Sequence, residues 1–372
     1  MLLYEYEGRR ILELYDIKTP KGYLVRDPRE VPTYVQILRG KAFLKVQVLG
    51  SGRGKAGGVR LVSSPEEGER VARELFEIEI LGQRPNKILV VEPVDIASEL
   101  YIGFIVNPIE CTISMLASPF GGMDVEELSK EKLLKLEIDP LIGLTNFIKR
   151  EVFKFLELPK PLFTEFSALV EKLYEIFNDY DCEFLEVNPL ALTKDQRLVV
   201  IDIRLSIDDN SLFRHPDFER EYLSRLNERE LIAHKFKFSF VELKGDVGVI
   251  GNGAGLTMAT MDLIAKLGIR PAFFLDIGGG ASADRVREAV KIALSYPNLK
   301  GLVINILGGI TRCDEVARGI VEALKFSKLE IPIAVRLSGT REEEGRKILE
   351  ANGIRYFTSM EEAISEIIKL VR

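Results

Sequence analysis

Tryptophan is absent from this 372-residue chain, histidine occurs twice and cysteine three times. Cys111, Cys182 and Cys313 are far apart and odd in number, which argues against a disulfide framework and a clustered zinc site. We expect them to be buried, reduced thiols. No apolar run approaches the roughly 20 residues that a membrane-spanning helix needs, and the first ten residues carry acids and arginines where an export signal needs an apolar core. These absences favour a cytoplasmic protein.

The chain also lacks an excess of positive charge. Its 51 Lys and Arg against 57 Asp and Glu give a net charge of -6, which argues against a general nucleic-acid binder because that affinity comes from clustered cations. With 46% hydrophobic and 29% charged residues, the composition is that of a globular enzyme. The length predicts two domains of about 150 to 230 residues. Because the chain has no overall excess of positive charge, any phosphate-binding site must be a local cluster of cations.

Short apolar runs alternate with helical patterns in the C-terminal part of the chain. Each run leads through glycine or polar residues into a helix, which predicts a doubly wound parallel α/β sheet. The runs are residues 247–250, 272–275, 302–306 and 333–335. Thr340 and Ser359 each precede a glutamate by three residues, a capping-box pattern that predicts a helix start. Asn352–Gly353 predicts a helix end.

The N-terminal part mixes strands and helices without that regularity, which indicates an α+β domain. Its β-rich segments are residues 43–48, 87–91, 101–106 and 110–115, and Ser64–Pro65 predicts a helix start. The charged, helical stretch from Glu219 to about Lys235 contains no glycine-rich break, so we interpret it as an ordered connector. The predicted domains are therefore residues 1–235 and 236–372.

Polar side chains alternate along two apolar runs on either side of Asp195. Glu186 and Asn188 share one face of the first run, and Asp202 and Arg204 share one face of the second. If the turn centres on Asp195, Asn188 lies opposite Asp202 and Glu186 opposite Arg204. Such a sparse set of oxygens suits Mg²⁺, which completes its octahedron with water and phosphate oxygens. From the spacing alone, a solvated hairpin face with a surface ion pair is equally compatible.

Residues 50–58 form a basic, glycine-rich segment, which we call the flap. Its five glycines expose backbone N–H groups, and Lys45, Arg53 and Lys55 add positive charge. The segment is not a Walker A sequence, and no helix start follows it directly. A mobile basic hairpin is the alternative, but this concentration of glycines and cations favours polyphosphate binding.

Three further glycine-rich turns follow consecutive strands of the C-terminal domain. They are Asn252–Gly255, Asp276–Gly280 and Asn305–Asp314. Turns of this kind at helix N-termini, at the carboxyl edge of a parallel sheet, favour anion binding. One such turn is easily explained as a tight turn alone, and three are less easily explained that way. We call the three turns the rim.

Together these motifs resemble the beta-subunit family of succinyl-CoA synthetase, the ADP- or GDP-forming succinate–CoA ligase. The resemblance runs nearly from end to end, and its motifs occur in one order. They are Lys45 with residues 52–58, then 95–101, 186–190, 209–214, 252–256 and 305–314. The resemblance implies an N-terminal ATP-grasp domain followed by a C-terminal flavodoxin-like CoA-ligase domain.

The resemblance also implies a role for individual residues. It assigns nucleotide binding, of ATP/ADP or GTP/GDP, to Lys45, Gly52, Arg53, Gly54, Glu92 and Glu99. It assigns Mg²⁺ to Asn188 and Asp202. It assigns the site for phosphate, succinate and phosphohistidine to Asn252, Gly309, Ile310 and Thr311.

Members of this family act with an alpha subunit, whose histidine carries the phosphate between nucleotide and succinate before CoA displaces it. Neither His215 nor His234 follows a glycine-rich strand turn, so we expect both to be structural. The phosphorylated histidine is then expected on a partner alpha chain, in a heterodimer or heterotetramer, and no catalytic residue is assigned to this chain. The rim becomes the surface that receives the partner's histidine loop. CoA and succinate are substrates of the complex.

Three residues depart from the family pattern, and the change at Phe120 leaves the acid substrate open. Phe120 stands where the family usually has Glu, Arg204 where Lys is common, and Ser338 where Glu is common. A malate- or other acid-specific CoA ligase is therefore the alternative enzyme, and a nucleotide-sensing subunit without catalysis is the alternative from another class. Pro20 resembles ATP-preferring members more than GTP-preferring ones.

Overall fold

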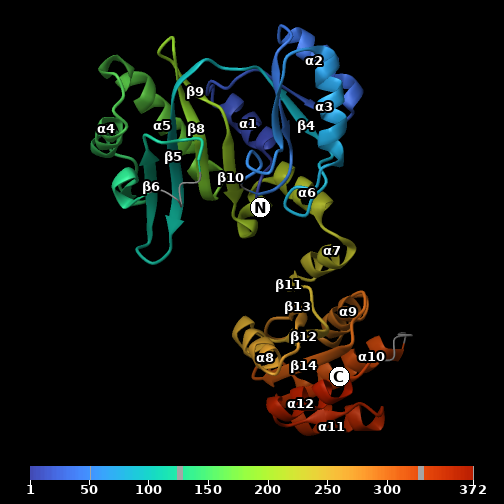
Figure 1. The fold of residues 1–372 in the computed structure, drawn as a ribbon. Coiled ribbons are helices and arrows are strands. Elements are labelled where there is room, and N and C mark those ends of the chain that lie inside the picture. The colour runs from blue at the N-terminus through green and yellow to red at the C-terminus, as the bar shows by residue number, and fades with distance from the viewer. Residues whose placement is uncertain (51, 124–128, 326–330, 372) are drawn as a thin grey trace. The chain divides into compact units, whose positions relative to one another are not determined.

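Contacts between residues divide the chain into two units, Met1–Glu219 and Arg220–Arg372. Each unit contains its own β-sheet core (Figure 1). The computed structural model describes residues 1–50, 52–123, 129–325 and 331–371. The predicted connector is helical and consists of α6 (Pro216–Arg225) and α7 (Glu228–Lys235). The contacts divide the chain within α6, whereas the predicted domains meet after α7. The assignment of these helices to one domain stays a prediction.

A four-stranded antiparallel sheet in the order β1-β4-β2-β3 forms the first layer of the N-terminal unit. Its strands are β1 (Gly22–Val25), β2 (Ala42–Val46), β3 (Val59–Val62) and β4 (Ile88–Val91). Helices α2 (Val31–Ile37) and α3 (Pro65–Glu77) pack their apolar residues against it. Helix α3 begins where predicted, because the Ser64 hydroxyl accepts a hydrogen bond from the backbone N–H of Glu67.

The second sheet of this unit is antiparallel, in the order β10-β8-β5-β6-β7, with β9 also paired to β8. Its strands are β5 (Ile96–Asn107), β6 (Thr112–Ser118), β7 (Leu134–Ile138), β8 (Cys182–Thr193), β9 (Leu198–Val200) and β10 (Ile203–Ile207). Helices α1 (Glu5–Leu14), α4 (Asn146–Phe155) and α5 (Phe163–Asp179) complete the unit. Phe104 of β5 makes ring contacts with Tyr174 and Phe177 of α5, which seats that helix on the sheet.

The C-terminal unit is the predicted doubly wound sheet. The strand order is β11-β13-β12-β14-β15-β16, and all neighbours pair in parallel except β11 with β13. The strands are β11 (Ser239–Glu242), β12 (Val247–Gly251), β13 (Pro271–Asp276), β14 (Gly301–Gly308), β15 (Ile333–Gly339) and β16 (Tyr356–Phe357). The helices are α8 (Ala254–Lys266), α9 (Ala283–Leu294), α10 (Cys313–Lys325), α11 (Glu342–Ala351) and α12 (Met360–Val371).

Both faces of this sheet are buried, since successive residues of each parallel strand point to opposite sides. Ile250 and Ile304 belong to the core that also contains residues of α9, α10 and α11. Their neighbours Val249 and Val303 belong to a second core with residues of α8 and α12. The near-continuous apolar strands of the sequence follow from this double cover.

Two local predictions are wrong. Thr340 does not cap a helix, because α11 starts at Glu342 with Arg341 as its N-cap and the Thr340 hydroxyl donates to the Gly309 carbonyl at 2.8 Å. Cys111 is exposed in the hairpin loop between β5 and β6, whereas Cys182 and Cys313 are buried as expected. Ser359 and Asn352 do mark the predicted start of α12 and end of α11.

Throughout the part of the chain that is described, no helix is both long and apolar enough to span a bilayer.

Candidate functional site

The hairpin around Asp195 has the predicted register. Leu192 pairs with Leu198 and Glu186 with Arg204, so the turn centres on Asp195. The backbone N–H of Asn188 donates to the carbonyl of Asp202 at 3.2 Å, which places these residues opposite one another. Arg204 lies 3.7 Å from the Glu186 carboxylate. The pairing predicted from alternation alone is therefore confirmed.

The side chains of Asn188 and Asp202 have partners in different segments. Asn188 Oδ1 accepts from the backbone N–H of Gly122 at 2.7 Å, and its Nδ2 donates to the Met123 carbonyl at 3.0 Å. The Asp202 carboxylate accepts two hydrogen bonds from Arg53 Nη2, at 2.8 and 3.0 Å. Each acceptor oxygen keeps a further lone pair, so both side chains could still serve as ligands.

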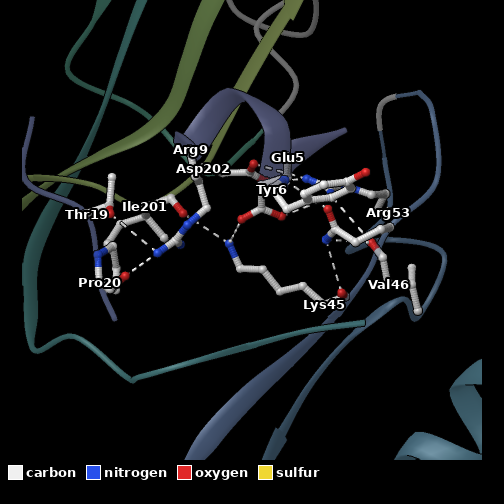
Figure 2. A network of polar contacts seen from close by, with 11 residues as sticks. Glu5, Tyr6, Arg9, Thr19, Pro20, Lys45, Val46, Arg53, Ile201 and Asp202 are labelled. Carbon is white, nitrogen blue, oxygen red and sulfur yellow. Dashed lines mark hydrogen bonds and ion pairs between the residues drawn. The ribbon is translucent and has the colours of Figure 1, made fainter. Parts of the chain in front are cut away.

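Two cationic side chains of this region are buried: Lys45 on β2, the strand before the flap, and Arg53 in the flap. Lys45, on β2, places its Nζ 2.7 Å from Glu5 Oε1 and 3.1 Å from the Ile201 carbonyl. Arg53, on the flap, places its Nη1 3.0 Å from Glu5 Oε2 while Nη2 contacts Asp202. Figure 2 shows these side chains converging from α1, β2, the flap and the segment before β10. The structure thus brings Lys45, Arg53 and Asp202 together as predicted, and adds Glu5.

Mutual neutralisation explains how these charges are tolerated in the interior. Burial alone raises the pKa of Glu5, but Lys45 and then Arg53 outweigh it and hold that pKa below its usual value. Burial alone lowers the pKa of Arg53, but the carboxylates of Asp202 and Glu5 outweigh it and raise that pKa. Glu5 and Arg53 therefore both favour their charged forms, whereas burial and the nearby Glu5 carboxylate raise the pKa of Asp202.

A cavity of about 570 Å³ opens beside this network, in the size range of small-molecule sites. Its lining residues are Lys18, Thr19, Pro20, Glu92, Pro93, Val94, Asp95, Thr193, Lys194, Asp195, Arg197 and Val199. Glu92 Oε1 accepts from the backbone N–H of Lys21 at 2.7 Å. Arg9 donates to the Thr19 hydroxyl at 3.4 Å and to the Pro20 carbonyl, so the network reaches the wall of the cavity.

The remaining predicted nucleotide residues are more exposed. Gly52 and Gly54 lie in the flap, where Gly52 has a positive φ of 79° and its carbonyl accepts from Ala56 at 3.0 Å. Ser51, part of the same motif, falls outside the described residues. Glu99, on β5, is exposed, and its carbonyl accepts from Gly121 at 2.7 Å. The structure places Glu99 beside the segment that holds Asn188, and not in the buried network.

In the C-terminal unit, the three turns of the rim lie side by side because β13, β12 and β14 are adjacent strands. Asn252 Nδ2 donates to the Leu307 carbonyl and its Oδ1 accepts from the Leu307 N–H, both at 2.9 Å. The buried hydroxyl of Thr311 accepts from the Gly280 N–H at 2.9 Å and from Asn252 at 3.3 Å. Asn252 and Thr311 therefore hold the three turns together.

A carboxylate already occupies part of the rim. Asp276 Oδ1 accepts from the backbone N–H of Gly253 at 2.6 Å and of Gly278 at 2.8 Å. These two amides thus bind an internal anion, which the sequence pattern did not reveal. Gly309 and Ile310 are exposed, Ile310 to 87%. Of the four residues predicted for this site, Gly309 and Ile310 are therefore the exposed ones, while Thr311 is buried.

Three arginines surround one buried carboxylate next to the rim. Asp314 lies 2.7 Å from Arg312, 2.7 Å from Arg318 and 3.5 Å from Arg341, and its side chain is only 3% exposed. The hydrogen bond from Arg312 is the main cause that lowers the pKa of Asp314 to about 2. The arginines themselves are 42% to 51% exposed, so they present positive charge to solvent.

The two histidines have structural surroundings. His215 Nε2 lies 2.8 Å from Asp181 Oδ2, and its ring stacks on Tyr180. His234 contacts the ring of Tyr222.

Within the described part of the chain, no group of three or more His, Cys, Asp or Glu side chains is placed to hold a metal. A magnesium site here would therefore rest on few protein oxygens, such as one carboxylate and one amide.

Two residues that depart from the family pattern make cation–π contacts. Lys132 Nζ lies 4.7 Å from the ring centroid of Phe120, and the Arg204 guanidinium lies 4.9 Å from that of Phe184. Phe120 is 43% exposed. Its ring thus gives Lys132 a neutral partner at a position where the family resemblance predicts a carboxylate.

Comparison with known proteins gives full-length matches. Residues 2–192 match the family model described as ATP-grasp domain, and residues 250–369 the one described as CoA-ligase. The chain is 49% identical over 376 residues to the beta subunit of ADP-forming succinate–CoA ligase from Desulfurococcus amylolyticus, covering 100% of this chain and 99% of that one. It is 44% identical over 374 residues to the subunit of the same name from Methanocaldococcus jannaschii, covering 99% and 100%.

A solved structure of ATP citrate lyase from Methanothrix soehngenii, in complex with citrate and coenzyme A, matches with a TM-score of 0.78 at 19% identity. The match covers 99% of each chain, and at this identity it concerns the fold alone. The predicted order of an ATP-grasp domain followed by a CoA-ligase domain is confirmed.

Proposed function

This chain belongs to the family of succinate–CoA ligase beta subunits, and from that membership we propose how it works. With an alpha subunit it interconverts succinate, CoA and ATP with succinyl-CoA, ADP and phosphate, through a phosphohistidine on the alpha chain. The relatives are named as ADP-forming enzymes, and GTP/GDP is the alternative nucleotide. Their names do not favour a malate- or other acid-specific ligase. A cytoplasmic location is part of the proposal.

The nucleotide assignment rests on the buried cations Lys45 and Arg53 and on the 570 Å³ cavity of the same unit, whose wall Arg9 contacts at Thr19 and Pro20. We assign the nucleoside to the cavity, next to Glu92, and the polyphosphate to Lys45, Arg53 and the N–H groups of Gly52 and Gly54. Phosphoryl transfer depends on positioning and on neutralising charge in a site of low polarity. Two cations held in place before the ligand arrives supply both.

Asn188 and Asp202 would hold Mg²⁺. Their donor atoms fit this ion, which takes one or two protein oxygens and keeps water and phosphate oxygens as further ligands. When bound, the ion would neutralise phosphate charge and orient the transferred group. Asp202, 28% exposed on its side chain, is open to solvent on one side, as such a ligand must be.

We assign the second site, for phosphate, succinate and the partner's histidine loop, to the rim. Asn252 and Thr311 keep the three turns in register, and Gly309 and Ile310 are the exposed positions. Ile310 is 87% exposed and Leu307 is 55% exposed, so the third rim turn presents two apolar side chains that the partner's loop would cover. His215, bonded to Asp181, and His234 are structural in this proposal, so the phosphorylated histidine comes from the alpha chain.

The test compares the chain alone with the co-expressed alpha–beta pair. The chain alone is expected to bind Mg-nucleotide in calorimetry and to form no acyl-CoA, whereas the pair forms succinyl-CoA from succinate. Rates measured with succinate, malate, acetate and citrate identify the preferred acid substrate. Repeating them with ATP and with GTP identifies the preferred nucleotide. Robust turnover by the chain alone would contradict the division of labour, and faster turnover of malate would support the alternative ligase.

A further inference from the structure

Glu5 holds both cations of the proposed nucleotide site. Its side chain is fully buried, and each of its oxygens takes a different partner: Lys45 at 2.7 Å and Arg53 at 3.0 Å (Figure 2). Lys45 and Arg53 are themselves only 8% and 12% exposed. Glu5 begins α1, a helix that belongs to neither the flap nor β2. It therefore fixes the flap cation and the strand cation to a common point.

Arg53 is shared between two carboxylates in different surroundings. Asp202 is 28% exposed on its side chain, whereas Glu5 is fully buried. Water or a metal ion can replace Arg53 at Asp202, but at the buried Glu5 the loss of Arg53 would leave Oε2 without this cation, with Lys45 still bound at Oε1. When Asp202 turns to another cation, Arg53 therefore stays with Glu5.

The donors of the two cations allow Glu5 to remain bound while phosphate binds. An ammonium group has three N–H donors and a guanidinium has five. Lys45 uses donors for Glu5 and for the Ile201 carbonyl. Arg53 Nη1 forms an ion pair with Glu5 Oε2 and donates to the Val46 carbonyl at 3.3 Å. Release of Asp202 frees Arg53 Nη2 for a phosphate oxygen. Glu5 thus orients donors without contacting the nucleotide itself.

We propose that Glu5 is a positioning residue of the nucleotide site, the fixed anchor of Lys45 and Arg53, while Asp202 is the partner that Arg53 exchanges. The inference rests on the proposed nucleotide binding by this chain. It predicts that loss of the Glu5 charge specifically weakens nucleotide binding, because both cations lose their orientation.

Glu5→Gln, which keeps the size of the side chain, tests this in the co-expressed alpha–beta complex. The KM for nucleotide is expected to rise about tenfold, the loss of one charge-assisted hydrogen bond. The KM for succinate, whose site lies in the other domain, is expected to change less than about twofold. Calorimetry with Mg-ADP is expected to give a matching rise in Kd.

Glu7→Gln is the matched control. Glu7 lies on the same helix, is equally buried, and accepts hydrogen bonds from the Tyr4 N–H at 2.8 Å and the Tyr6 hydroxyl at 2.9 Å. Its variant is expected to lose thermal stability and to keep the nucleotide KM. If Glu5→Gln does not fold, Glu5→Asp keeps the charge at a shorter reach and is expected to raise the nucleotide KM about threefold.

The outcomes separate the two proposals. If the wild-type complex does not bind Mg-ADP, the proposed function fails. If it binds and the Glu5 variants keep its Kd, or if the KM for succinate rises as much as that for nucleotide, Glu5 is merely structural and the inference is overturned. A selective rise in the nucleotide KM, present in the Glu5 variants and absent in Glu7→Gln, supports it.

Discussion

The hydroxyl oxygen of Thr311 accepts a hydrogen bond from the backbone N–H of Gly280 at 2.9 Å. Thr311 is 1% exposed, so water cannot replace this acceptor. We expect Thr311→Val to lower the free energy of unfolding by about 1 kcal/mol, the net contribution of one hydrogen bond, since the donor residue Gly280 is itself exposed. Because Gly280 and Asn252 both lose a partner, the KM for succinate should rise while that for nucleotide stays constant. Denaturant unfolding and steady-state kinetics measure both effects.

Thr260→Val is the control for that prediction. Thr260 is also buried, and its hydroxyl accepts from the side chain of Asn305 at 2.8 Å. Asn305 is the first residue of the third rim turn but is fully buried, so this contact lies beneath the exposed Gly309–Ile310 positions. A comparable loss of stability with an unchanged KM for succinate is expected. If both variants raise this KM equally, the rim has no special role.

Lys45→Met should separate nucleotide binding from general stability. Removing one partner of a buried ion pair costs about 3 kcal/mol or more, and Glu5 would keep only Arg53. We expect calorimetry to show loss of Mg-ADP binding under conditions where circular dichroism shows a folded chain. Lys149→Met is matched in burial, since Lys149 is 6% exposed and pairs with Glu171 at 3.3 Å. This second variant should bind Mg-ADP normally.

Chelation of Mg²⁺ should weaken nucleotide binding in the wild-type chain. In Asp202→Asn we expect the Kd for ADP to be the same with Mg²⁺ as with a chelator, because the carboxylate proposed as ligand is gone. Glu183→Gln, at an exposed position of β8 outside the lining of the cavity, should keep the wild-type magnesium dependence. Retained dependence in Asp202→Asn would remove Asp202 from the metal site.

Asp314 should make the C-terminal unit sensitive to acid. Its pKa is lowered to about 2, mainly by Arg312, while an unfolded aspartate titrates near about 3.9. The stabilisation is therefore complete above about pH 4 and is lost as the pH falls towards 2. We expect Asp314→Asn to lower the free energy of unfolding by about 2 kcal/mol at neutral pH, and by less at about pH 3. An equal difference at both pH values would assign the loss to packing instead of charge.

Local patterns in the sequence predicted those parts of the site that depend on local geometry. The register of the hairpin follows from alternation about Asp195, because a slip of one residue would turn every side chain to the other face. The adjacency of the three rim turns follows from the rule that parallel strands end at a common edge. Both predictions needed only the period of a strand and the position of glycines.

Contacts between distant segments could not be predicted in this way. Glu5 meets Lys45 and Arg53 across 40 and 48 residues, and in the sequence it is simply an acid in the first turn of a helix, a common feature. Asp276 follows a strand like many polar residues, and nothing local shows that it binds two glycine amides. The prediction that Thr340 caps a helix is wrong because its hydroxyl donates a hydrogen bond to the carbonyl of Gly309, a residue of another turn.

Asn188 and the segment from Ser118 to Met123 belong to one hydrogen-bonded assembly, since the amide bonds Gly122 through its oxygen and Met123 through its nitrogen. This segment contains Phe120, where the chain departs from its family. Replacing this segment with that of another family member would therefore also change the two backbone groups that orient the side chain of Asn188. The orientation of the proposed metal ligand thus depends on the backbone of a segment that is remote from it in sequence.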